Sequence, residues 1–210
     1  MSVTAISIPP TCQSLSSSTI GAMGRWEADA RGRLEQAALD LYGEQGFEHT
    51  TVAEIAERAG LTERTYFRYF ADKREVLFWG AARLQESLVS AVVAAADSAA
   101  PIDAVIAALD AAGAVFQEHR EHSVRRQAVI AANAELQERE LIKLAKLASA
   151  LAGALHRRGV KEPTASLAAE AGITVFRIAY ERWINDTSRR DLPQHIRESF
   201  DELKTVTAGR

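Results

Sequence analysis

The sequence predicts an all-α fold, and three observations carry this prediction. Apolar residues recur at helical spacing along most of the 210-residue chain, and strand-like alternation is nowhere convincing. Prolines stand where helices would begin, at Pro163 and Pro193, and glycines stand where helices would end, at Gly60 and Gly159. The chain is 47% hydrophobic and 25% charged, the balance of an ordinary soluble globular protein. We therefore expect packed helices with ample chain for a core.

The N-terminal segment is expected to be a disordered extension, over residues 1–24. Its first 22 residues are rich in Ser, Thr and Pro and contain no Lys or Arg. They also lack the charged start and the long apolar stretch of a secretory signal. A second hypothesis places the true start of translation at Met23. A helix is then expected over Arg31–Gln45, with one apolar face formed by Leu34, Ala37, Ala38 and Leu41.

Two short helices joined by a tight turn are expected between Thr50 and Lys73. Thr51 can act as N-cap with Glu54 three residues later, which is a capping-box pair. Gly60 suits the left-handed backbone that ends a helix, and Thr62 can cap the next one. The apolar face of the first helix consists of Val52, Ile55, Ala56 and Ala59.

The second helix has two chemically different sides. At about 100° per residue, Tyr66 and Phe70 fall together and face the core. The opposite side carries Arg64, Thr65 and Arg68, with Phe67 and Tyr69 on the flanks.

The outward side of this helix has the chemistry needed to read base edges in a DNA major groove. Arginine binds guanine O6 and N7 bidentately, and a threonine methyl packs on thymine. Tyr69 and Lys73 are better placed for phosphates, which position a protein without reading sequence. A solvated basic face over an aromatic core is the alternative. The agreement of caps, turn and outward residues favours DNA binding.

The chain after Lys73 is expected to be helical throughout. Asp72 and Glu75 form a second capping-box pair, so a long helix is expected from Lys73, and its positive end could attract a phosphate. The expected helices are Lys73–Asp97, Ile102–His119, Glu121–Asn133, Glu135–Arg158, Pro163–Asn185 and Pro193–Thr205.

The residues of this DNA-binding segment resemble the signature of the tetracycline-repressor (TetR) family. The resemblance rests on Thr51, Ile55-Ala56, Ala59-Gly60, Thr65, Phe70 and Lys73. It implies a three-helix domain over residues 25–77, followed by a ligand-binding and dimerisation domain over residues 78–210. It also implies a cytoplasmic homodimer that represses transcription from a palindromic operator. Phe67 departs from the pattern, because the family usually has a phosphate-contacting tyrosine at this position.

Two late helices carry stripes that could form a dimer interface. The spacing of the first stripe is heptad-like. Both stripes could equally face the core of their own domain. The resemblance favours the interface, because family members dimerise through their last two long helices. The expected interface consists of Ala169, Gly172, Phe176, Ala179 and Trp183, together with Phe200 on the last helix.

The middle of the chain would hold an effector that the sequence does not identify. Its apolar residues could line a pocket or belong to the core, and exposed arginines are the ordinary alternative to an acid-binding group. His119 and His122 lie three residues apart beside Glu118, but a solvated cluster is favoured over a metal site. No metal or cofactor is therefore expected. The candidate pocket residues are Trp79, Phe116, His119, His122, Arg126 and Asn133.

Charge and motif content narrow the classes of function. The net charge is −3, and residues 25–80 contain eight Lys or Arg against eleven Asp or Glu, which disfavours a protein that coats nucleic acid. A local basic patch must then attract the phosphates, formed by Arg64, Arg68, Lys73 and Arg74 with help from Arg25, Arg31 and Arg33.

Other classes are disfavoured by what the sequence lacks. Its single cysteine, Cys12, excludes an internal disulfide or a cysteine-based zinc site. No apolar run approaches the roughly 20 residues of a membrane span. No HExxH, paired cysteines or glycine-rich phosphate loop points to an enzyme. An architectural DNA-binding protein without an effector is the alternative function.

Overall fold

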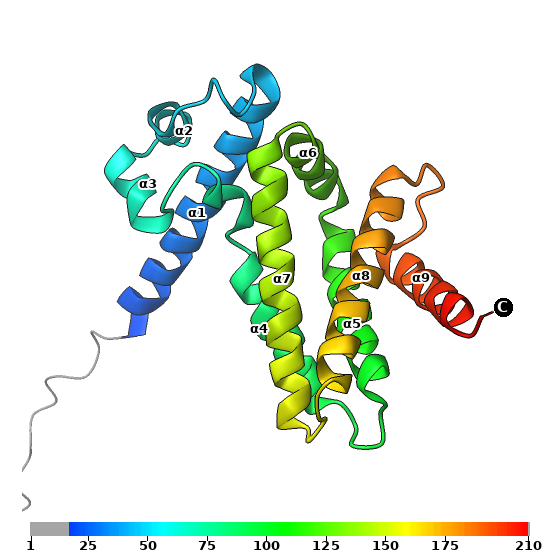
Figure 1. Ribbon diagram of the computed structural model, residues 1–210. Coiled ribbons are helices and arrows are strands. Elements are labelled where there is room, and N and C mark those ends of the chain that lie inside the picture. Colours follow the sequence, from blue (N-terminus) through cyan, green and yellow to red (C-terminus); the bar gives the residue numbers. More distant parts are fainter. Residues whose placement is uncertain (1–16, 210) are drawn as a thin grey trace, which may run out of the picture.

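The prediction of an all-α fold is confirmed. The computed structural model describes residues 17–209, and the regular elements over this range are all helices (Figure 1). They are α1 (Ser17–Gln45), α2 (Val52–Arg58), α3 (Glu63–Tyr69), the 3-10 helix η1 (Glu75–Phe78), α4 (Ala81–Ala94), α5 (Pro101–Glu118), α6 (Arg120–Ala131), α7 (Ala134–Arg157), α8 (Thr164–Asn185) and α9 (Leu192–Thr207).

The first helix is longer than the sequence indicated. It begins at Ser17 and not at Arg31, so residues 17–24 are helical where disorder was expected. A helix nucleated further along the chain extends easily, because each added residue gains one hydrogen bond. Residues 1–16, with Cys12 and most of the expected disordered extension, lie outside the described part of the chain.

Helices α1, α2 and α3 surround one small core, at the upper left in Figure 1. Its centre consists of side chains with almost no exposed surface, including Leu34, Ile55 and Tyr66. Two residues from further along the chain, Ile130 and Leu136, complete the same core. We call α1, α2 and α3, which the sequence predicts to bind DNA, the DNA-binding unit. This unit is packed directly against the α6–α7 turn.

The long helix expected over Lys73–Asp97 is divided into η1 and α4. Val76, Leu77 and Phe78 are three consecutive residues, and all three are buried in the core of the DNA-binding unit. Three consecutive residues of a 3-10 helix point in three different directions. Their joint burial therefore means that η1 is covered on several sides, by α1–α3 and by Ile130 and Leu136, and α4 starts after Gly80.

One segment of the described chain, Glu75–Ala94, is long and apolar enough to cross a membrane, contrary to the expectation from apolar runs alone. In the structure this segment comprises η1 and α4, and Leu88 and Val92 pack in the core of the body. Core helices of globular proteins have the same composition. A single segment of this kind is therefore weak evidence for a membrane span.

Helices α4, α5, α7, α8 and α9 form the body of the molecule, with α5 and α8 at its centre. The residues expected to form a dimer interface lie inside this body. An apolar stripe at 3–4 spacing arises on any helix with one buried face, so the heptad-like pattern did not distinguish a partner helix from neighbouring helices of the same chain. All six are buried in the protomer: Ala169, Gly172, Phe176, Ala179, Trp183 and Phe200.

Gly172 allows α8 to pack closely on α5. A Cβ atom at Gly172 would overlap Cγ1 of Val105, because the two atoms would be closer than any non-bonded pair of carbon atoms. Val105 has no exposed surface, and its branched side chain has little rotamer freedom within a helix. Gly172 is therefore needed for packing within one chain.

We expect Gly172→Ala to destabilise the protein by about 1–2 kcal/mol, because the overpacking penalty exceeds the gain in helix propensity. The matched control is Gly153→Ala in α7, where the nearest atom to a new Cβ is the end of the Arg157 side chain at 3.9 Å. That substitution should stabilise the protein by about 0.5–1 kcal/mol. Urea unfolding measures both changes. Equal effects of the two substitutions would contradict the close packing of α5 on α8.

Candidate nucleic-acid interface

The candidate recognition helix is α3, which buries one side and exposes the other. Thr62 caps its start, with its hydroxyl accepting the backbone N–H of Thr65 at 3.2 Å. Tyr66 is fully buried, as predicted, and its hydroxyl donates to the carbonyl oxygen of Asp72 at 3.1 Å. These two contacts fix both ends of the short helix. Arg64, Phe67 and Arg68 lie on its exposed side.

Helix α2 and the turn after it hold α3 at its angle. The capping box at Thr51 is present, because Glu54 donates its N–H to the Thr51 hydroxyl and accepts the Thr51 N–H at 2.8 Å. Gly60 takes a left-handed φ of 65°, which only glycine adopts readily. Arg33 of α1 donates to the carbonyl oxygen of Ala59 at 3.1 Å, so α1 braces the turn.

Thr51 was predicted to contact DNA, but its polar atoms already serve the cap. Its hydroxyl donates to Glu54 Oε2 at 2.8 Å while accepting the Glu54 N–H. The Thr51 N–H and hydroxyl together hold the pKa of the Glu54 carboxyl below its usual value. Thr65 is similarly engaged, since its hydroxyl lies 3.0 Å from that of Thr62. The methyl groups of the two threonines remain available for apolar contacts.

Lys73 was predicted to anchor a phosphate, and the structure gives it an internal role. Its Nζ donates to the carbonyl oxygens of Phe47 at 2.8 Å and of Thr50 at 3.3 Å, and it lies 3.4 Å from that of Glu48. The ammonium group also stands 4.2 Å from the centre of the Phe47 ring. An ammonium group has three donors, and these contacts occupy all of them. Lys73 therefore fastens the α1–α2 loop to the end of the DNA-binding unit.

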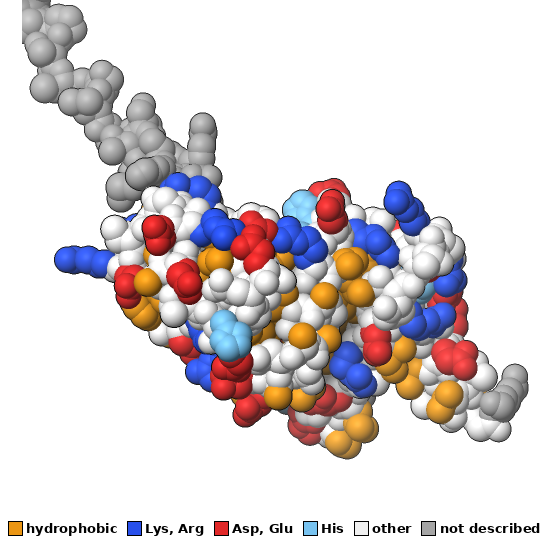
Figure 2. All heavy atoms as spheres, turned by 90° about the horizontal axis from the view of Figure 1, so that it is seen from above, with side chains coloured by type: hydrophobic (Ala, Val, Ile, Leu, Met, Phe, Trp, Pro, Cys, Tyr) orange, Lys and Arg blue, Asp and Glu red, His pale blue; other side chains and the backbone are white. Residues whose placement is uncertain are grey.

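The basic patch is smaller than the sequence suggested. Arg74 pairs with Asp72 at 2.8 Å and with Glu135 at 3.6 Å, so its charge is already compensated. Arg33 braces the α2–α3 turn, as described above. Among the described side chains of the predicted patch, the exposed cations are then Arg64, Arg68 and, from α1, Arg31. The side chain of Arg25, also expected in the patch, lies outside the described part of the structure. Over the face drawn in Figure 2, acidic and basic side chains are interspersed, in keeping with the net charge of −3.

Two of the reading-face aromatics differ sharply in their surroundings. Phe67 is 54% exposed, and its ring meets the buried Tyr66 edge-on at 5.7 Å. Tyr69 is half-buried, and two guanidinium groups lie near its ring: that of Arg68 at 4.7 Å and that of Arg31 at 5.1 Å. The Tyr69 hydroxyl also accepts a hydrogen bond from Arg68 at 2.6 Å. The exposed ring of Phe67 suits an apolar contact and cannot donate to a phosphate.

The six residues expected to line an effector pocket do not converge on one site. Phe116 packs in an aromatic cluster with Phe176 and Tyr180, and His119 lies exposed at the α5–α6 junction. The other four connect the body to the DNA-binding unit, through Trp79 to Glu35, His122 to Glu35, Arg126 to the carbonyl oxygen of Leu77, and Asn133 to Glu48.

The body holds η1 through a charged contact that sequence reasoning missed. Glu75 of η1 lies 3.2 Å from Arg139 and 2.8 Å from Lys143, both on α7. Their spacing of four residues puts both cations on one face of α7, which was the available signal. Arg126 adds a hydrogen bond of 2.8 Å to Leu77 and lies 4.9 Å from the Phe78 ring. We call these residues of α6, α7 and η1 the η1 clamp.

Metal binding has no support in the described residues. No group of three or more His, Cys, Asp or Glu side chains among them could hold a metal ion. His122 instead pairs with Glu35 at 3.4 Å.

Comparison with known proteins identifies the family. A model for bacterial regulatory proteins of the tetR family matches residues 35–78, and a model for the MftR C-terminal domain matches residues 99–208. The chain belongs to the TetR family. The TetR resemblance inferred from the sequence is thereby confirmed, and with it the assignment to DNA-binding transcriptional regulators of the helix-turn-helix type.

Individual relatives agree with this assignment. The chain is 27% identical over 183 residues to a Mycobacterium tuberculosis protein named as the mycofactocin biosynthesis transcriptional regulator MftR, covering 85% of this chain and 91% of MftR. It is 42% identical over 62 residues to the transcriptional regulator TcmR of Streptomyces glaucescens, covering 30% of this chain but only 27% of TcmR. The SmeT–triclosan complex has the same fold, with a TM-score of 0.60 at 19% identity, over 82% of this chain and 88% of SmeT.

Replacing Lys73 by methionine tests its internal role in this TetR-family domain. Methionine keeps the apolar stem but leaves the loop carbonyls without their donor, so we expect a loss of about 1–3 kcal/mol in the free energy of unfolding. Urea unfolding measures this loss. The control Arg64→Met changes an exposed cation and should alter stability by less than about 0.5 kcal/mol. Unchanged stability of Lys73→Met with weaker DNA binding would restore the phosphate role.

Proposed function

We propose that this protein is a homodimeric, ligand-responsive repressor that binds a palindromic operator in the cytoplasm. The observation that carries the proposal is the exposed side of α3. Arg64, Phe67 and Arg68 project from a short helix whose opposite side, at Tyr66 and Phe70, is buried in the core shared with α1 and α2. Rigid support of this kind is what base-edge contacts require, because a loose side chain reads no sequence.

The proposed reading contacts divide between hydrogen bonding and apolar packing. Arg64 and Arg68 would bind guanine O6 and N7, and each bidentate contact discriminates against a wrong base by about 1–3 kcal/mol. Phe67, with 54% of its surface exposed, would pack against a thymine methyl or a sugar. With few cations exposed near α3 among the described side chains, non-specific attraction to phosphate would be modest. Specific binding would therefore depend on base contacts and on two copies acting together.

A different stripe of α8 supports the proposed dimer. Leu167, Ala171, Thr174 and Ile178 are spaced 4, 3 and 4 residues apart, and Leu167 and Ile178 are 66% and 42% exposed. This stripe is offset by two residues, or about 200°, from the stripe that is buried in the protomer. On α9, Val206 is 68% exposed. Exposed apolar side chains repeated on neighbouring helices favour pairing with a second copy.

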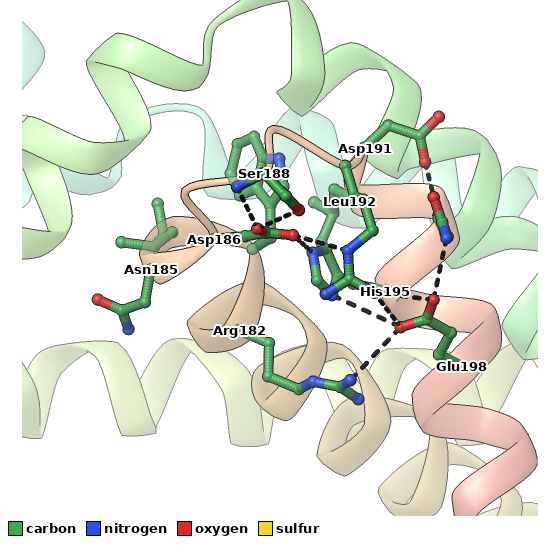
Figure 3. Close-up of polar contacts among 12 residues, drawn as sticks. Arg182, Asn185, Asp186, Ser188, Asp191, Leu192, His195 and Glu198 are labelled. Atoms are coloured by element: carbon green, nitrogen blue, oxygen red, sulfur yellow. Dashed lines mark hydrogen bonds and ion pairs between the residues drawn. The ribbon is translucent and has the colours of Figure 1, made fainter.

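Several polar contacts connect the end of α8 to the start of α9 (Figure 3). They would fix the relative orientation of the two helices in the proposed interface. Asp186, at the end of α8, accepts hydrogen bonds from Ser188 and from Arg190, the latter at 2.9 Å. The buried His195 of α9 lies 2.9 Å from the same carboxylate. The hydrogen bonds from Ser188 have the largest effect in holding the pKa of the Asp186 carboxyl well below its usual range, and those from Arg190 and His195 add to it.

The η1 clamp supports a route from effector to DNA. Arg126 donates a hydrogen bond to the carbonyl oxygen of Leu77. Burial raises the pKa of the Tyr180 hydroxyl, and the positive charge of Arg126 opposes this rise, so the two groups are electrostatically coupled. Tyr180 belongs to the aromatic cluster with Phe116, Phe176 and Trp183. A small molecule that shifts this cluster would move Arg126 and hence η1. The effector must bind the DNA-incompetent state more tightly, and operator DNA must weaken effector binding by the same factor. SmeT, which has this fold, was solved with a small molecule, triclosan.

The proposed dimer predicts that Ile178→Glu converts the protein to a monomer at micromolar concentration. Two buried carboxylates facing each other across a two-fold axis would be repelled and poorly solvated. Light scattering after size exclusion measures the mass. The control Leu141→Glu changes a residue that is 62% exposed on α7 and should remain a dimer. A dimeric Ile178→Glu protein would exclude this face of α8 as the interface.

The proposed dimer predicts that the operator is an inverted repeat. Selection of bound fragments from the source genome tests this prediction. Half-sites should be separated by one helical turn, about 34 Å, or a multiple of it. Small molecules related to the products of genes beside the selected site are then screened for release of the protein from DNA. A selected operator from which no compound releases the protein would favour an architectural role, and bound fragments without any common sequence would contradict specific recognition.

A further inference from the structure

Three side chains at the edge of the reading face form one cluster: Arg31 of α1 and Arg68 and Tyr69 of α3. The Arg68 guanidinium donates to the Tyr69 hydroxyl at 2.6 Å while its carbon lies 4.7 Å from the ring centre. The Arg31 guanidinium lies 5.1 Å from the same ring centre. Two cations therefore share one aromatic ring, and one of them is also hydrogen-bonded to it.

This geometry restricts Arg68 before DNA arrives. A free arginine side chain on a helix surface samples many rotamers and loses that freedom on binding a base. A cation–π contact and a short hydrogen bond together select one orientation. A guanidinium has five N–H donors, and the bond to Tyr69 uses one of them. Enough donors remain for the two parallel bonds that guanine accepts.

The Tyr69 hydroxyl can still donate a hydrogen bond to DNA. Because it accepts a hydrogen from Arg68, its own proton points elsewhere and is available to an acceptor such as a phosphate oxygen. Tyr69 is half-buried, and its ring lies 6.5 Å from that of the buried Phe70, so the domain core supports it. Tyr69 is thus anchored more firmly than the arginine that it contacts.

We propose that Tyr69 is the positioning residue for Arg68, holding its guanidinium in the orientation that reads a guanine, with Arg31 steadying the Tyr69 ring from α1. This inference rests on the proposed function, because it assigns a role within the same DNA-reading face. It differs from the sequence expectation, in which Tyr69 only anchored a phosphate. The specificity of this regulator then depends on a residue that need not touch a base.

The test measures the affinity of purified full-length protein for duplexes that carry each of the four bases at every operator position. Comparison of the Arg68→Ala variant with the wild-type protein identifies the position that Arg68 reads. The preference for guanine at that position should fall roughly 5- to 150-fold in the variant. Tyr69→Leu removes both the ring and the hydroxyl and should lower the preference at this same position to a similar extent. Tyr69→Phe keeps the ring and should have an intermediate effect.

The double variant separates positioning from simple contact. If Tyr69 acts through Arg68, Arg68→Ala with Tyr69→Leu should show the same base preference as Arg68→Ala alone, because the two effects are not additive. Thermal melting of each variant checks the fold, and Tyr69→Phe retains the core-facing ring.

Two outcomes would overturn the inference. The first is a Tyr69→Leu protein with weaker binding to all duplexes and an unchanged guanine preference, which would make Tyr69 a phosphate contact. The second is an Arg68→Ala protein with wild-type preference at every position. A wild-type protein that prefers no sequence would instead refute the proposed function itself.

Discussion

The placement of the recognition helix depends on the Lys73 ammonium group. Lys73 follows α3 in the chain, and its Nζ binds carbonyl oxygens of the α1–α2 loop, at Phe47 and Thr50. The Tyr42 hydroxyl of α1 donates to the Lys73 carbonyl at 2.6 Å, so the same residue is held at its backbone and at its side chain. Because the three-helix unit has only a small apolar core, it relies on these polar contacts of Lys73 to fix the orientation of α3 relative to α1 and α2.

The unit is attached to the body through η1 in a way that combines burial with charge. Val76, Leu77 and Phe78 enter the core of the DNA-binding unit, while Glu75 beside them pairs with α7. The apolar contacts connect η1 to α1, α2 and α3. The ionic contacts and the hydrogen bond from Arg126 connect η1 to α6 and α7. In the proposed function, a displacement in the body would reach α3 through η1.

In the proposed function, recognition would rest on few groups. Most basic side chains near α3 serve the protein itself: Arg33 braces a turn, Lys73 closes the unit, and Arg74 is paired with acids. Among the described residues, the exposed cations of the predicted patch are Arg64 and Arg68 on α3 and Arg31 on α1. Since the chain carries a net charge of −3, selectivity would have to come from how accurately these few groups are oriented. Their supporting contacts would then be as important as the residues proposed to read bases.

The sequence by itself determined most of the helices and the two sides of α3, because caps, prolines, glycines and helical periodicity act over about four residues. It did not determine the start of α1 or the break between η1 and α4. Local signals of this kind could be interpreted without a distant partner, as at Thr51 with Glu54, Gly60, Tyr66 and Pro163. Only the tertiary structure decided which residues from distant parts of the chain contact each other. The Lys73 ammonium group donates to the carbonyl oxygen of Phe47, at a sequence separation of 26 residues. Asn133 donates to Glu48, at a separation of 85 residues. Gly172 and Trp183 entered the protomer core because an apolar stripe specifies burial but not the identity of the surface that covers it.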